Sequence, residues 1–81
     1  MKTEKLTYKQ HEEIGEKLKE IRAFMINLAV EIPNRYGKSK RLSKAAVKSF
    51  RDIDALRNAI ENQFFIDYPS EATTQIYYGT V

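Results

Sequence analysis

His11 is the single histidine of this 81-residue chain and the first side chain to consider for metal or acid–base chemistry. A helical metal pair needs a second ligand three or four positions later, and those positions hold Ile14 and Gly15. The Glu-x-x-His pattern of di-iron bundles is also absent, because Tyr8 stands three residues before His11. We therefore predict that His11 forms a polar layer at the end of a helix seam and binds no metal.

Carboxylates recur along the same stretch at a spacing that places them on one helix face, at Glu12, Glu16 and Glu20. Lysines stand among them, and Lys17 follows Glu13 by four residues, the favourable order for a helical ion pair. General acid–base catalysis needs carboxylates in different environments inside a pocket, which a thin helical layer does not offer. The chain also lacks cysteine and has only three isolated glycines. We predict no enzyme activity, no metal and no cofactor.

The basic segment, residues 32–51, carries seven Lys or Arg side chains and no carboxylate. Residues 1–31 have balanced charge and residues 52–81 are acidic, so the positive charge of the chain is concentrated in its middle. Such a segment predicts a phosphate-bearing or acidic partner. An aromatic side chain among the cations can also stack on an unpaired base. The candidates for polyanion binding are Arg35, Tyr36, Lys38, Lys40, Arg41, Lys44 and Lys48.

Three interpretations of the basic segment stay open. The cations crowd the start of a predicted helix, where the helix dipole makes each exposed positive charge unfavourable by roughly 0.3–1 kcal/mol. Phosphates of a nucleic acid or another polyanion would offset this cost, or the cations are ordinary solvated surface. A second copy of the chain would offset it with its own acidic residues, Asp52, Asp54, Glu61 and Asp67. The sequence carries no recognised DNA-reading motif.

Two long helices must position these residues. Thr7 and Gln10 match a capping box, which predicts a helix that begins near Tyr8. Pro33 lacks the N–H that continues a helix, so we expect this helix to end or kink there. Between these points the apolar residues recur at 4-3-4-3-4 spacing, which is typical of a helix packed lengthwise on another: Ile14, Leu18, Ile21, Met25, Leu28 and Ile32.

The second helix is predicted to begin near Ser39 or Ser43 and to run to about Asp67, before the stop signal Tyr68-Pro69. Its apolar stripe consists of Leu42, Ala46, Val47, Phe50, Ile53, Leu56, Ile60 and Phe64. The fold class is therefore all-α.

The predicted organisation is a long antiparallel two-helix hairpin over residues 1–69, with helices at about 8–32 and 40–67 and a turn at about 33–39. Residues 70–81 form a C-terminal tail rich in Thr, Ile and Tyr. For this tail we expect an irregular frayed end, or a short strand or arm laid on a partner.

A hairpin buries one seam, yet residues 23–32 are apolar nearly all round the helix. Leaving each large apolar side chain exposed forgoes roughly 1.5–3 kcal/mol of burial. A two-fold dimer whose hairpins form a four-helix bundle would cover this second face. A monomer with its tail folded back over the face is the alternative. The candidates for the dimer interface are Phe24, Ile26, Val30 and Phe65.

Residues 1–5 are largely charged and no apolar stretch follows them, so we expect no secretory signal. The longest apolar-rich run covers about half of a membrane span of roughly 20 residues, so we expect no membrane insertion and a cytoplasmic location.

The sequence predicts a small non-enzymatic interaction or assembly module that self-associates as a homodimer and can also bind a protein partner. The alternative is a nucleic-acid or polyanion-binding adaptor that uses the basic turn and the start of the second helix.

Overall fold

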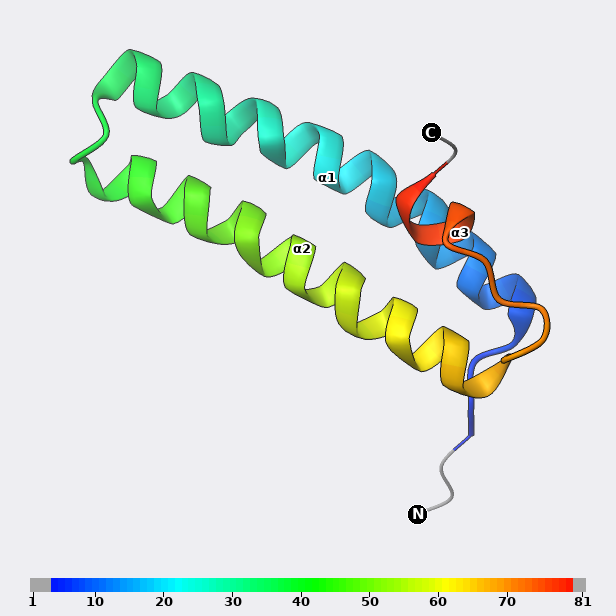
Figure 1. The fold of residues 1–81 in the computed structure, drawn as a ribbon. Coiled ribbons are helices and arrows are strands. Elements are labelled where there is room, and N and C mark those ends of the chain that lie inside the picture. The colour runs from blue at the N-terminus through cyan, green and yellow to red at the C-terminus, as the bar shows by residue number, and fades with distance from the viewer. Residues whose placement is uncertain (1–3, 80–81) are drawn as a thin grey trace.

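The computed structural model describes residues 4–79, which form three helices: α1 (Tyr8–Tyr36), α2 (Arg41–Asp67) and α3 (Gln75–Tyr78). The two long helices run antiparallel and pack lengthwise, and α3 lies across the N-terminal half of α1 (Figure 1). None of the described residues is in a strand. The predicted all-α fold with a long antiparallel hairpin is confirmed.

The start of α1 is the predicted capping box. The Thr7 Oγ1 atom accepts a hydrogen bond from the Gln10 N–H at 3.1 Å, and the Gln10 Oε1 atom accepts from the Thr7 N–H at 2.8 Å. At the other end, α1 continues past Pro33 to Tyr36 and does not end near residue 32. Pro33 removes only one donor, and its own carbonyl still accepts from the Gly37 N–H at 2.9 Å. Gly37, with φ of 88°, then ends the helix.

The turn between the long helices is held by Ser43, one of the two serines near which the second helix was predicted to begin. α2 begins at Arg41 with Lys40 at the N-cap position, and Lys40 makes no side-chain capping bond. The Ser43 hydroxyl is buried and donates to the Gly37 carbonyl at 2.6 Å. Ser43 therefore fastens the first turn of α2 to the end of α1 and does not cap α2 from outside.

The hairpin forms a layer little thicker than one helix. The molecule measures 46 × 35 × 15 Å, and a helix with its side chains is about 10–12 Å across. Parts of the predicted apolar stripes consequently stay exposed, with 41% of Ile21 and 51% of both Leu42 and Leu56 accessible to solvent. The buried hydrophobic side chains among the described residues are Leu18, Ala46, Phe64 and Tyr77.

The C-terminal tail packs against α1 as a short helix. Two backbone hydrogen bonds of 2.9 Å close its turns. The Tyr78 N–H donates to the Thr74 carbonyl, and the Gly79 N–H donates to the Gln75 carbonyl. We expected an irregular or strand-like tail, and this expectation was wrong for residues 75–78 because burial of Tyr77 decides the conformation. Residues 80 and 81, which the same expectation covered, lie outside the described residues.

Gly15 makes the docking of α3 possible. A Cβ atom at this position would collide with the backbone carbonyl of Ile76 and with its side chain. Gly15 lies inside α1 and is buried, where glycine weakens a helix by about 1 kcal/mol relative to alanine. The close approach of α3 gives the physical reason for a glycine here.

Changing Gly15→Ala should therefore destabilise the protein, although alanine favours a helix. We expect the free energy of unfolding in urea to fall by about 1–3 kcal/mol, because the added methyl group displaces α3. Chymotrypsin should also cleave after Tyr77 faster than in the unchanged protein. The neighbouring exposed change Glu16→Ala is the control and should alter neither quantity. A more stable Gly15→Ala protein would show that α3 does not pack on α1.

Candidate functional site

The basic segment surrounds the closed end of the hairpin, from the last turn of α1 to the middle of α2. All seven candidates for polyanion binding are exposed. Two of them are partly neutralised by carboxylates of their own helix. Arg35 Nε donates to Glu31 Oε1 at 3.0 Å, and Lys48 Nζ donates to Asp52 Oδ2 at 2.8 Å. The Lys and Arg side chains of the basic segment without an ion pair among the described residues are Lys38, Lys40, Arg41, Lys44 and Arg51.

A groove of about 540 Å³ lies between α1 and α2 beside the turn, and we call it the turn-side groove. Its apolar walls combine the end of α1 with the first half of α2, and cations surround its rim. It brings together three of the predicted candidates, whereas Arg35, Tyr36, Lys40 and Arg41 lie outside it. Its lining residues are Ala29, Val30, Pro33, Asn34, Lys38, Ser43, Lys44, Val47, Lys48 and Arg51.

Sequence reasoning missed the role of Arg51 and of the apolar walls in this groove. A usable signal was present on α2, where Lys44, Val47, Lys48 and Arg51 follow one another at three- and four-residue spacing and so share one side of the helix. The α1 wall had no such signal, because nothing in the sequence pairs Val30 with a particular part of α2.

The predicted acidic stripe on α1 is solvated surface. Glu12, Glu16 and Glu20 are exposed, and they line an open hollow of about 830 Å³ along the outside of the helix. Lys17 lies 3.7 Å from Glu20 and Lys19 lies 3.9 Å from Glu16, which are weak exposed pairs. The described residues contain no group of three or more His, Cys, Asp or Glu side chains placed to hold a metal ion.

The four candidates for the dimer interface are all exposed, but they do not share one face. Phe24 and Ile26 are two residues apart on α1, which separates them by about 200° around the helix. Val30 lines the turn-side groove, and Ile26 lies with it along an adjoining hollow. Phe65 lies near the end of α2, away from the turn beside which Val30 lies on α1, and its ring is 6.1 Å from that of Phe64. The structure therefore leaves Phe24 on a different side from Ile26 and Val30.

Phe24 belongs to what we call the apolar face, formed with Ile21 and Leu56. Their exposed fractions are 63%, 41% and 51% respectively. Leu56 precedes Arg57, whose guanidinium lies over the ring of Tyr78, so a step of about 100° turns Leu56 away from the side that α3 covers. Sequence reasoning assigned Ile21 and Leu56 to the seam. A stripe of apolar residues does not reveal how much of its width one partner helix covers.

An aromatic cluster around Phe64 joins both long helices to α3. The His11 ring is fully buried, its centroid lies 4.5 Å from that of Phe64, and its Nδ1 atom is 2.5 Å from the Tyr77 hydroxyl oxygen. Tyr8 and Tyr68 pack their rings 5.3 and 6.0 Å from the Phe64 ring. His11 lies at the end of the hairpin away from the turn, where the polar layer was predicted.

Burial sets the protonation of the His11–Tyr77 pair. Removal from water lowers the pKa of His11, although the negative charge of Asp67 acts in the opposite direction. Burial, assisted by the charge of Glu61, raises the pKa of Tyr77 to about 12. Both rings are therefore neutral at pH 7. The His11 Nε2 atom has no hydrogen-bond partner among the described residues, so a protonated ring would carry a poorly solvated charge.

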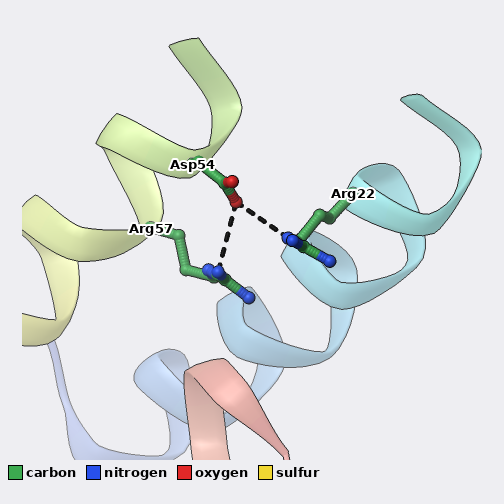
Figure 2. Close-up of polar contacts among 3 residues, drawn as sticks. All are labelled: Arg22, Asp54 and Arg57. Atoms are coloured by element: carbon green, nitrogen blue, oxygen red, sulfur yellow. Dashed lines mark hydrogen bonds and ion pairs between the residues drawn. The ribbon is translucent and has the colours of Figure 1, made fainter. Parts of the chain in front are cut away.

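A second polar cluster crosses the hairpin nearer its middle (Figure 2). Asp54 Oδ1 accepts a hydrogen bond from Arg22 Nε at 2.8 Å and forms an ion pair with Arg57 Nη2 at 3.2 Å, so one carboxylate holds a guanidinium of each long helix. Arg22 lies over the Phe50 ring at 5.1 Å, and Arg57 lies over the Tyr78 ring at 4.0 Å. This cluster ties α1, α2 and α3 together.

Comparison with protein-family models, with curated proteins and with solved structures found no match to this chain. Within residues 4–79, no helix is both long enough and apolar enough to cross a membrane. The candidate sites are therefore the turn-side groove and the apolar face, which the geometry alone defines.

The cluster in Figure 2 predicts that Asp54→Asn destabilises the hairpin. The change leaves two neighbouring guanidinium groups without their shared carboxylate, and we expect a loss of about 1–2 kcal/mol in the free energy of unfolding. Asp52→Asn is the matched control, because Asp52 pairs only with the exposed Lys48 of its own helix, and it should cost less than about 0.5 kcal/mol. Equal losses in the two variants would contradict the bridging role of Asp54.

The buried His11 ring predicts a stability that depends on pH. The fold lowers the pKa of His11, so the full free energy of unfolding is present above the ordinary value of 6.5 and should decrease as the pH falls below it. Urea unfolding between pH 7.5 and 5 measures this slope, and His11→Gln should flatten it. Burial raises the pKa of Glu61, so protonation of Glu61 acts in the opposite direction at more acidic pH. The same slope in both proteins would rule out His11 as its source.

Proposed function

We propose that this protein is a small non-enzymatic assembly module that forms a homodimer through its apolar face. The observation that carries the proposal is the exposure of Ile21, Phe24 and Leu56 on one side of a molecule only 15 Å thick. Monomeric proteins rarely leave large contiguous apolar patches in water. A second copy stacked on this face would complete the second layer that a helical domain normally has.

The composition of the apolar face supports close packing by another helix pair. On α2 the exposed residues on either side of Leu56 include Ala45, Ser49 and Ala59, which are reached from it in steps of three and four residues. Small side chains at such positions let a partner helix approach, while Phe24 and Leu56 supply the large groups that would be buried. A closed two-fold dimer uses the same face twice and leaves no unsatisfied copy.

The position of the tail also supports a second copy as the partner. The alternative to a dimer predicted from the sequence was a monomer whose tail folds back over the second apolar side of residues 23–32. The tail does fold back on the hairpin, but α3 contacts Gly15 and Arg57, on the side from which Leu56 is turned away. The apolar face thus has no cover from the described part of the chain. The cytoplasmic location expected from the sequence stays a prediction.

The dimer predicts the effect of charges placed on the apolar face. Phe24→Glu combined with Leu56→Glu should convert the dimer to a monomer, because each change replaces roughly 1.5–3 kcal/mol of burial by a desolvated charge. Both side chains are exposed in the single hairpin, so the helix content should be retained. Light scattering at tens of micromolar protein would give the mass, and circular dichroism would give the helix content.

Two controls locate the interface. Ile66→Glu places a charge on a residue that is 71% exposed and lies ten positions after Leu56 on α2, and it should leave the dimer intact. Ile26→Glu combined with Val30→Glu tests the face predicted from the sequence. Dissociation by this pair, but not by the changes at Phe24 and Leu56, would move the interface to the side of the groove. A monomeric unchanged protein at this concentration would overturn the proposal.

A further inference from the structure

We propose that the turn-side groove is a second binding site, and that its ligand is an acidic peptide segment of a partner protein. The groove lies on the side of the hairpin that α3 covers farther from the turn. On α1, Pro33 follows Gly15 by eighteen residues, which is about five full helical turns, so both point to the same side. On α2, Val47, Asp54 and Glu61 follow one another at intervals of seven residues and form one stripe. The groove residue Val47 is therefore on the same side of α2 as Asp54 and Glu61.

The chain itself shows what kind of ligand suits this side of the hairpin. At the end away from the turn, the short helix α3 lies across α1 (Figure 1), with Tyr77 fully buried and Tyr78 stacked on Arg57 at 4.0 Å. The hairpin therefore already binds a short peptide helix through a buried aromatic anchor, Tyr77, with Ile76 beside it, and through a contact with a cation. At the turn end, no described segment of the chain plays this part.

The charges of the turn-side groove specify an acidic ligand. Three cations that line the groove have no ion pair among the described residues: Lys38, Lys44 and Arg51. The fourth, Lys48, forms an ion pair with Asp52. Beneath this rim the walls are apolar and include Val30 and Val47. A peptide that carries carboxylates on either side of a small apolar anchor would satisfy both features at once.

The same walls argue against a nucleic acid as the ligand. Single-stranded nucleic acids are held by cations together with aromatic side chains on which the bases stack. The walls of the groove are aliphatic, and Tyr36, the aromatic residue of the basic segment, is 57% exposed and lies outside the groove. An apolar anchor has a place in this groove, whereas a base has no ring to stack on.

The test uses the full chain and a short fluorescein-labelled peptide rich in glutamate, with two leucines four positions apart. Fluorescence anisotropy should show binding that weakens as salt increases. Lys44→Glu combined with Arg51→Glu should raise the dissociation constant about tenfold or more. Both residues are exposed, and a negative charge near the start of α2 suits its helix dipole, so folding should be preserved. Circular dichroism verifies this.

Two further variants separate the groove from general attraction. Lys9→Glu combined with Lys17→Glu makes the same change in net charge on the outside of α1 and should leave the dissociation constant within about twofold. Val47→Asn keeps the charge of the rim and should weaken binding several-fold, because it removes part of the apolar wall. Equal effects of the two charge-reversed pairs, or no effect of Val47→Asn, would overturn the proposal.

The remaining outcomes concern the ligand and the dimer. Absence of measurable peptide binding at low salt would overturn the proposal. A mixed-sequence single-stranded oligonucleotide is the second probe. If it binds the unchanged protein more tightly than the peptide does, and binds the Lys44→Glu, Arg51→Glu protein more weakly, the groove is a nucleic-acid site and the proposal is overturned. The Phe24→Glu, Leu56→Glu protein should bind the peptide as the unchanged protein does. Failure of the groove and failure of the dimer are thus observed in separate measurements.

Discussion

Phe64 is the residue on which the three helices converge, and the folded chain depends on its burial. Its ring packs against rings from the start of α1, from the end of α2 and from α3, and it has no exposed surface. In a molecule this small, few side chains reach full burial, so each contributes a large share of the hydrophobic stabilisation. The cluster also holds the segment that precedes α1. The Tyr68 hydroxyl donates to the Leu6 carbonyl at 2.7 Å, which joins the segment before α1 to the end of α2.

The hairpin is consequently held unevenly along its length. At the end away from the turn, aromatic packing buries Phe64 and Tyr77 beneath three helices. Near the middle, the partly exposed Asp54 carboxylate forms ion pairs with Arg22 and Arg57. At the turn, Ser43 and Gly37 share one hydrogen bond and Ala46 supplies a small buried side chain. Buried apolar area decreases toward the turn, and the end of the hairpin with the least core is the end that carries the basic groove.

The two sides of the layer have different properties, which is why we assign them different roles. One side carries α3, the turn-side groove and the cations Lys44 and Arg51, and it suits a charged peptide. The other carries Phe24 and Leu56 without a covering segment and suits a second copy of the chain. Charge gives specificity and a dependence on salt, whereas apolar area gives affinity that salt does not screen. The two contacts are therefore able to form independently.

The sequence by itself determined the two long helices, because capping and periodicity are local properties of the chain. The capping box at Thr7 and the end of α2 at Asp67 were predicted at the residues where they occur. Only the tertiary structure decided the state of the tail, the faces to which the exposed apolar residues belong, and the walls of the groove. Strand-forming residues around Tyr77 became helical because Gly15 and Phe64 offer them a buried site, and no local preference contains that contact. Likewise, the placement of Phe24 and Val30 on opposite sides depends on how α2 and α3 surround α1, which is a relation between distant segments.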